Sequence, residues 1–259
     1  MDKKSLKLGS RDFVGALASG LEVLQIFDAE HPRMTLSEVA EHAGMDRAKA
    51  RRFVLTLHSL RFVKRIGRQF ALTPRVLRLG YAYHASNEYR AVIAQYLGEI
   101  TAELGESSSW GVLDDNDVVY VVRSAARYRL MAITLSVGSR LPAAYTSMGR
   151  VLLSQLTEQE LESFLNTVEL KAFTPCAIMS KDVLREEIKK VRLQGFSIVD
   201  QELDSGLRSV AVPVYTGSNE LLGALNISTN AARVDIEMLM SIHLLRLQEV
   251  ADKVRLTVQ

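Results

Sequence analysis

Residues 35–60 read Thr35-Leu-Ser-Glu-Val-Ala-Glu-His-Ala-Gly44 and then Met45-Asp-Arg-Ala-Lys-Ala-Arg-Arg-Phe-Val-Leu-Thr-Leu-His-Ser-Leu60. Thr35 and Glu38 have the spacing of a capping box, which starts a helix, and Gly44 supplies the turn that ends it. Asp46 can cap a second helix, whose apolar residues recur at three- and four-residue spacing. Two helices joined by a tight turn with glycine are typical of a helix-turn-helix.

The region around this pattern carries charge of one sign. Between Arg47 and Arg78 there are ten basic residues and no acidic one. Residues 1–85 hold 15 Lys and Arg against 8 Asp and Glu, a net of +7, whereas residues 86–259 hold 17 against 22, a net of −5. A folded segment of a single sign indicates a polyanionic partner, and a merely solvated basic surface is the alternative.

A hairpin and a further helix are expected after the second helix. The β-prone runs Phe62–Ile66 and Gln69–Leu72 flank Gly67, and Pro74 starts a helix that reaches about Tyr83. We expect a winged helix-turn-helix whose second helix enters the major groove of double-stranded DNA while the wing holds phosphates. The alternative is a three-helix core with coincidental surface arginines. The residues expected to contact DNA are Thr35, Ser37, Arg47, Lys49, Arg51, Arg52, Thr56, Arg65 and Arg68.

The rest of the chain mixes β-prone runs with helical segments. With 259 residues, the chain is long enough for two modest domains. We expect strands at 107–113, 118–123, 130–137, 196–201, 209–215 and 221–228, and helices at 88–104, 147–154, 158–166, 181–194 and 234–253. Because the strands come in hairpins and the helices cluster between them, the fold class is α+β with a largely antiparallel sheet.

The inventory of reactive residues is thin for an enzyme. The single cysteine, Cys176, excludes an internal disulfide, and the five histidines are scattered rather than set at metal-ligand spacing. The sequence has no nucleophile elbow, phosphate-binding loop or dinucleotide fingerprint. We therefore expect no catalytic residue, metal or cofactor. The apolar run at 13–21 continues with helical periodicity and is interpreted as an amphipathic helix, so we expect a soluble cytoplasmic protein with no membrane partner.

Two polar stretches of the second half are candidate binding segments. In Leu141–Arg150, small polar residues and glycine lead into a helix, whose free N–H groups suit a carboxylate; a plain N-cap by Thr146 or Ser147 is the alternative. Val199–Ser209 is a polar loop between apolar strands, and a solvated connection is its alternative. An enzyme for a small aromatic or dicarboxylic acid, anchored to DNA, and an architectural DNA-binding protein without a ligand are the competing functions.

Four motifs of the second half resemble IclR-type transcriptional regulators. They are Val137-Gly-Ser-Arg-Leu-Pro142, Thr146-Ser-Met-Gly-Arg-Val-Leu-Leu153, Gln194-Gly-Phe-Ser-Ile-Val-Asp-Gln-Glu-Leu203 and Gly206-Leu-Arg-Ser-Val-Ala-Val-Pro213. Thr174-Pro175 and Leu225-Asn-Ile-Ser-Thr-Asn230 further resemble the subgroup that controls β-ketoadipate-pathway genes for aromatic catabolism. Cys176 stands where that subgroup often has arginine.

The resemblance implies a winged helix-turn-helix domain (1–74), a linker helix (75–88) and a GAF-like effector-binding domain (89–259). It also implies a small organic acid as effector, aromatic or dicarboxylic, and self-association as a dimer or tetramer. Asp200 or Glu202 is expected to bond a ligand hydroxyl or Arg208, because an uncompensated acidic pair would repel a carboxylate. The effector site implied by the resemblance consists of Ser147, Met148, Gly149, Asp200, Glu202, Ser209, Asn226 and Ser228.

Overall fold

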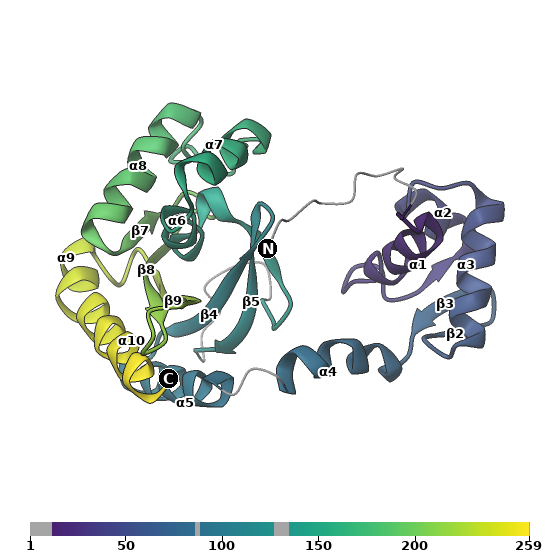
Figure 1. The fold of residues 1–259 in the computed structure, drawn as a ribbon, viewed down its shortest axis with the longest axis horizontal. Coiled ribbons are helices and arrows are strands. Elements are labelled where there is room, and N and C mark those ends of the chain that lie inside the picture. The colour runs from purple at the N-terminus through teal and green to yellow at the C-terminus, as the bar shows by residue number, and fades with distance from the viewer. Residues whose placement is uncertain (1–11, 86–88, 127–134, 259) are drawn as a thin grey trace. The chain divides into compact units, whose positions relative to one another are not determined.

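The chain divides into two compact units, Met1–Asn87 and Glu88–Gln259 (Figure 1). The computed structural model describes residues 12–85, 89–126 and 135–258. Each unit has its own buried apolar core, so each is described by itself. No helix of the described ranges is long and apolar enough to cross a membrane.

The N-terminal unit is a winged helix-turn-helix. Its elements are α1 (Gly15–Gln25), β1 (Met34–Thr35), α2 (Leu36–His42), α3 (Arg47–Ser59), β2 (Val63–Ile66), β3 (Gln69–Leu72), η1 (Pro74–Val76) and α4 (Leu77–Ala85). The β2–β3 hairpin turns at Gly67, whose φ of +62° is readily adopted by glycine, and β1 pairs with β3 on its other side. The predicted helix pair and wing are confirmed.

The C-terminal unit has an α+β fold. Its strands are β4 (Ser107–Asp114), β5 (Asp117–Ser124), β6 (Arg140–Pro142), β7 (Ser197–Asp200), β8 (Leu207–Tyr215) and β9 (Leu221–Asn230). Among the described residues these six strands form one antiparallel sheet in the order β6-β5-β4-β9-β8-β7. The predicted antiparallel sheet is therefore confirmed.

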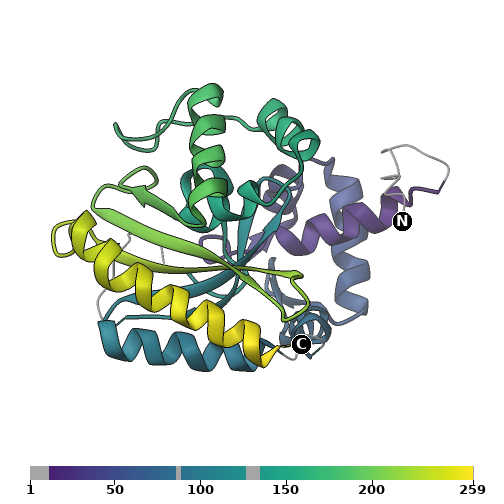
Figure 2. The same cartoon turned by 60° about the vertical axis from the view of Figure 1, so that its left-hand side comes forward.

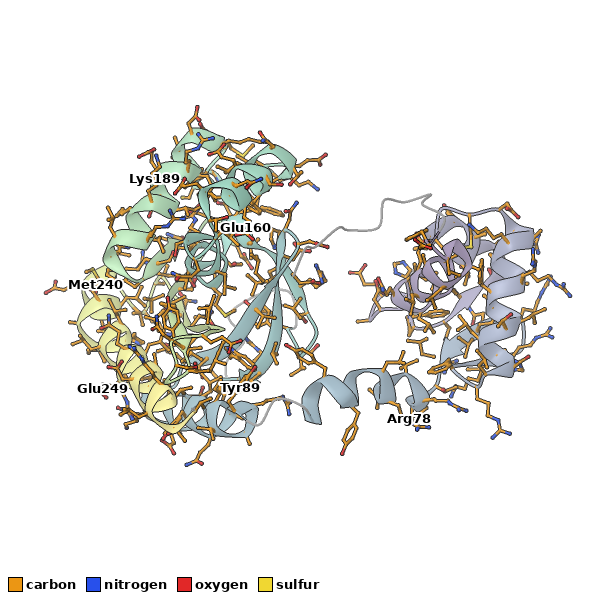
Figure 3. The ribbon with its side chains drawn as sticks, in the orientation of Figure 1. Arg78, Tyr89, Glu160, Lys189, Met240 and Glu249 are labelled. Atoms are coloured by element: carbon orange, nitrogen blue, oxygen red, sulfur yellow. The ribbon has the colours of Figure 1, made fainter. Side chains whose placement is uncertain are left out.

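Helices cover both faces of this sheet (Figure 2). They are α5 (Tyr89–Leu104), η2 (Ala143–Tyr145), α6 (Ser147–Ser154), α7 (Glu158–Thr167), α8 (Lys181–Gln194), α9 (Ile236–Met238), η3 (Leu239–Leu244) and α10 (Leu245–Thr257). One core lies between the sheet and α6, α7 and α8, and the other lies between the sheet and α5 and α10. Lys189 and Glu249 lie on the outer sides of α8 and α10 (Figure 3).

Two predicted elements of this unit differ from the structure. Of the strand expected at 130–137, residues 130–134 lie outside the described residues, and residues 135–137 form no strand. There the chain turns instead, with Gly138 at a φ of +88° and the Ser139 hydroxyl accepting the Ser136 N–H, before the short edge strand β6. The last predicted helix contains a π-helical segment, η3, and ends at Thr257 rather than near residue 253.

Candidate DNA-binding surface and effector cavity

Side-chain caps fix the two helices of the helix-turn-helix. The Thr35 hydroxyl accepts the Glu38 N–H at 3.4 Å, and the Glu38 carboxylate accepts the Thr35 N–H at 2.6 Å, which completes the predicted capping box of α2. Asp46 caps α3 by accepting the Lys49 N–H at 2.8 Å. Each cap satisfies a backbone donor that has no partner inside its helix, so the start of α3 is held in place.

The basic side chains of this unit face solvent. Ala50, Val54 and Leu57 point α3 into the core, so its other faces carry exposed side chains, which include Arg47, Lys49, Arg51, Arg52 and Thr56. None of the ion pairs among the described residues involves a basic residue between 47 and 78. This positive surface can therefore meet a polyanion without breaking any ion pair of the described residues.

The remaining predicted DNA contacts lie on the wing and on α2. Arg65 and Arg68 are exposed on the hairpin, and the Arg65 Nε donates to the Gly67 carbonyl at 2.9 Å, which holds its side chain near the tip. Ser37 is exposed on the first turn of α2, whereas the Thr35 hydroxyl already serves as the helix cap. Lys49, Arg52 and Thr56 also line a groove of about 770 Å³ between α1 and α3.

The C-terminal unit contains a small cavity between α6 and the sheet. Ser147 lies at the start of α6, and Ser209, Asn226 and Ser228 lie on β8 and β9; these four predicted site residues all line it. Its other lining residues are Tyr120, Leu141, Tyr145, Thr146, Val199, Leu203 and Leu207. The structure therefore brings together residues from four separate segments of the sequence.

Two polar atoms of this lining have no hydrogen-bond partner. Ser147 is 1% exposed and Asn226 is 3% exposed, and the Ser147 Oγ and the Asn226 Oδ1 are both buried and unpaired. The Asn226 Nδ2 donates to the Ser228 Oγ at 3.0 Å, so the amide is already held in one orientation. Since an unpaired buried polar atom costs about 1–3 kcal/mol, both atoms favour a polar ligand in the cavity.

The cavity is nearly closed. Its volume is about 20 Å³, roughly the space that holds one water molecule. An aromatic acid can therefore enter only when part of the wall moves. Leu203 and Leu207 of the wall are half-buried, at the turn between β7 and β8.

Two predicted residues at the helix start are closed off from this cavity. Gly149 donates its N–H to the Thr146 hydroxyl at 3.1 Å, so Thr146 is the N-cap. A Cβ on Gly149 would lie only 2.1 Å from the Ala143 carbonyl oxygen, which shows how tightly η2 packs there. Met148 is fully buried, with its sulfur against Gly111 of β4. Of the three predicted residues, only Ser147 lines the cavity.

Asp200 does not line the cavity either. Val199 and Ser209 face it as cross-strand partners, and the next pair, Asp200 and Arg208, faces the opposite side of the sheet because side chains alternate along a strand. There Arg208 donates to both Asp200 carboxylate oxygens at 2.8 and 2.9 Å, and to the Val234 carbonyl. Of the two partners expected for Asp200, a ligand hydroxyl or Arg208, the structure shows Arg208, so Asp200 is a member of an internal ion pair rather than of the cavity lining.

Glu202 is buried in a second internal ion pair. Its Oε2 accepts from the Arg150 Nη2 at 2.7 Å and from the Ile178 N–H at 3.1 Å, while the Arg150 Nε donates to the Ala144 carbonyl. This carboxylate thus joins α6, the 171–178 segment and the loop that carries Leu203. It has the geometry of a positioning residue for the cavity wall, rather than of a ligand contact.

Sequence reasoning missed a polar row on the cavity face of the sheet. Arg123, Ser109 and Asn226 are successive cross-strand partners on β5, β4 and β9, so their side chains share one face. The Arg123 Nη1 donates to the Ser109 Oγ at 3.3 Å. Burial lowers the pKa of Arg123 from its usual value, and burial also raises the pKa of Tyr120 to about 12, so that the Tyr120 hydroxyl keeps its proton at neutral pH.

The described residues contain no cluster of His, Cys, Asp and Glu that could hold a metal ion.

The segment around Cys176 is bonded to the β7–β8 loop. Cys176 is exposed, and its N–H donates to the Thr174 hydroxyl, which in turn donates to the Gln201 carbonyl at 2.6 Å. The hydrogen bond from Thr174 therefore fixes the loop that contains Gln201 and Glu202, and the next residue of this loop, Leu203, lines the cavity.

Comparisons with known proteins identify both units. Residues 16–67 match the IclR helix-turn-helix domain, and residues 81–256 match the C-terminal domain of bacterial IclR transcriptional regulators. The chain is 40% identical to the Pca regulon regulatory protein of Pseudomonas putida over 87% of this chain and 78% of the relative. Relatives of this chain are named as regulators rather than enzymes, which supports a regulator over the DNA-anchored enzyme.

Solved structures agree with this assignment. A transcriptional regulator from Rhodococcus sp. RHA1 is similar with a TM-score of 0.80 and 41% identity, over 95% of this chain and 98% of that chain. The inducer-binding domain of a double mutant of PobR from Acinetobacter, in complex with 3-hydroxybenzoic acid, is similar with a TM-score of 0.59 and 29% identity, over 64% of this chain and 96% of that chain. The chain therefore belongs to the IclR family of bacterial transcriptional regulators.

Proposed function

We propose that the chain binds an operator through α3 and the wing, and that an aromatic carboxylic acid bound in the cavity changes this binding. The observation that carries the effector site is the pair of unpartnered buried atoms, the Ser147 Oγ and the Asn226 Oδ1, which face one cavity. The 40% identity to a Pca regulon regulator and the likeness to a hydroxybenzoate-bound domain support an aromatic acid as the effector class. Genes of aromatic catabolism are the targets that fit such an effector.

In this proposal the N-terminal unit supplies affinity and base preference. Arg51 and Arg52 approach base edges from α3, and either guanidinium can pair bidentately with guanine. Arg65 and Arg68 hold phosphates from the wing, and Arg47, Lys49, Thr56, Thr35 and Ser37 surround the same face. Of the linker helix expected at 75–88, the structure describes α4 (Leu77–Ala85), which in this proposal couples DNA binding to the effector-binding domain.

Self-association is part of the proposal. Leu17 and Leu21 on α1 and Leu77 and Tyr81 on α4 are exposed although they are large and apolar. Such residues on two helices of a small unit suit contact with a second copy of the chain. A dimer would place two recognition helices on two half-sites of one operator, which gives a small module greater specificity.

The test uses the full-length chain with duplex DNA selected by it from a random-sequence library. Benzoic acid, 3- and 4-hydroxybenzoate and protocatechuate are screened for an increase in melting temperature and for a change in affinity for the selected DNA. We expect at least one aromatic acid to raise the melting temperature, because a ligand that binds only the folded state stabilises it. We expect the same acid to change the affinity for the selected DNA. A chain that binds DNA but responds to none of these acids would contradict the effector class and leave the DNA-binding role standing.

The cavity is tested with Ser209→Leu, which fills it and removes a hydroxyl. We expect this variant to lose the thermal response to the acid while it still binds the selected DNA. Ser163→Leu is the matched control, because Ser163 is exposed on α7 and the same substitution there leaves the cavity untouched. An undiminished acid response in Ser209→Leu would place the effector elsewhere.

A further inference from the structure

From the cavity residue Asn226, a row of cross-strand partners leads along the sheet to a guanidinium that has no carboxylate partner among the described residues. Arg123 is half-buried on β5, and none of the ion pairs among the described residues includes it. Burial lowers the pKa of Arg123, and the neighbouring Tyr120, which lines the cavity, acts in the opposite direction. Its single described side-chain hydrogen bond is the 3.3 Å contact with Ser109. A half-buried cation of this kind has lost part of its hydration and has no ion pair that compensates for the loss.

The row that contains Arg123 leads directly to the cavity. Ser109 is the cross-strand partner of both Arg123 and Asn226, and Asn226 lines the cavity. Ser109 is 1% exposed, so its hydroxyl is not hydrated from outside. Two strand spacings of about 4.8 Å separate Arg123 from Asn226. One aromatic ring with polar groups at opposite ends can bridge such a distance.

The two ends of this row differ in chemistry. At the α6 end, the Asn226 Oδ1 is an unpartnered acceptor and the Gly149 N–H is already bonded to Thr146, so that end is poorly equipped for a carboxylate. A ligand hydroxyl fits there, because it can donate to Asn226 and accept from the Ser147 hydroxyl. At the other end, the planar fork of an arginine matches a carboxylate in a bidentate way.

We propose that Arg123 binds the carboxylate of the effector, with Ser109 beside it, and that the ligand hydroxyl lies at Ser147 and Asn226. This inference rests on the proposed function and reverses the orientation expected from the helix start of α6. It makes Arg123 the residue that distinguishes an aromatic acid from its uncharged analogues. Ser147 and Asn226 then distinguish hydroxylated acids from benzoic acid itself.

The test compares 3- and 4-hydroxybenzoate with the corresponding hydroxybenzamides, which have nearly the same shape and no charge. Binding to the full-length chain is measured by calorimetry. We expect wild type to prefer acid over amide by about tenfold or more, and Arg123→Gln to lose this preference by weakening the acid alone, since one hydrogen bond to a charged group has about this value. Arg255→Gln, which removes one exposed charge on α10, should keep the wild-type preference.

A second variant keeps the inference testable if Arg123→Gln does not fold. Arg123→Lys retains the charge but not the fork, so we expect an acid preference between those of wild type and the neutral variant. Retention of the full wild-type preference in these variants would overturn the role of Arg123 while the effector class stands. If wild type binds the amides as well as the acids, the carboxylate contact is overturned, and if it binds neither, the proposed effector class also falls.

Discussion

The two units treat their basic residues in opposite ways. In the N-terminal unit the cations between Arg47 and Arg78 are exposed and have no carboxylate partner, whereas twelve of the thirteen ion pairs among the described residues lie in the C-terminal unit. An exposed cation is stabilised by water and needs no partner, but a buried one must be paired. The comparison shows that burial decides what an unpaired cation indicates: an exposed one needs no partner within the protein, whereas a buried one indicates a missing anionic partner.

Arg123 lies between these two cases. It belongs to the unit in which Arg150 and Arg208 are buried and paired, yet its only described side-chain hydrogen bond is to a serine hydroxyl. A row of unpaired exposed cations suits a polyanion that arrives from solvent. A single half-buried cation beside a cavity suits one carboxylate on a small ligand.

The largest effect is expected where pairing is broken in the buried interior. Glu202→Ala leaves Arg150, which is 2% exposed on its side chain, without its carboxylate. We expect the free energy of unfolding of the C-terminal unit to fall by about 3–5 kcal/mol. Urea denaturation followed by Trp110 fluorescence measures this, because the only tryptophan of the chain is buried in that unit.

The matched control is Glu158→Ala. Glu158 pairs with Arg192 on the surface, with side-chain exposures of 67% and 34%, and exposed pairs contribute about 0–1 kcal/mol. The double variant Arg150→Met, Glu202→Leu should recover part of the loss, since it removes both charges. Equal losses for Glu202→Ala and Glu158→Ala would break the distinction between buried and exposed pairs.

A smaller effect, of a different kind, is expected on the DNA-binding surface. Arg51→Ala and Arg52→Ala remove exposed, unpaired cations, so stability should change by less than about 0.5 kcal/mol. Loss of a base contact should weaken operator binding by about 1–3 kcal/mol and relax the preference at one base position. Mobility-shift titrations with the selected DNA and its single-base variants measure both effects.

Arg255→Ala provides the control for lost charge, because it removes an exposed cation from α10 in the other unit. We expect it to leave operator binding unchanged. Undiminished binding by Arg51→Ala and Arg52→Ala, and by Arg65→Ala and Arg68→Ala on the wing, would show that the DNA-binding face lies on another surface of the unit.

The helix-turn-helix was predictable because its signals are local. Thr35 with Glu38, and Asp46 with the Lys49 N–H, act within three residues, and Gly67 fixes the turn of the wing. The sequence therefore predicts both helices and the hairpin close to their observed bounds. The strand expected across 130–137 shows the converse, because β-prone composition alone did not reveal the turn at Gly138.

The effector cavity was only partly predictable because it depends on strand register. Family resemblance supplied Ser147, Ser209, Asn226 and Ser228, which do meet at the cavity. The strand expected at 196–201 already contained Asp200, but the resemblance did not reveal that the register of β7 directs that side chain to the other face of the sheet. Arg123 and Asn226 are brought into one row by Ser109 of β4, across more than 100 residues of sequence, and no local pattern records that pairing.

The smallest effect is expected on the wing. Arg65 and Arg68 are exposed near the tip, and the Arg65 Nε is held by the Gly67 carbonyl, so its guanidinium is presented to one side of the hairpin. If these cations contact phosphates, Arg65→Ala and Arg68→Ala should weaken binding to all sequences alike and lower the slope of log affinity against log salt by about one each. Titrations of selected and scrambled duplexes at several salt concentrations measure that slope. Substitutions on the recognition helix should change the ratio between selected and scrambled DNA, whereas those on the wing should leave it intact. If Arg65→Ala and Arg68→Ala change the base preference but not the salt slope, the wing contacts base edges instead of phosphates. Arginines on both α3 and the wing would then contribute to sequence specificity.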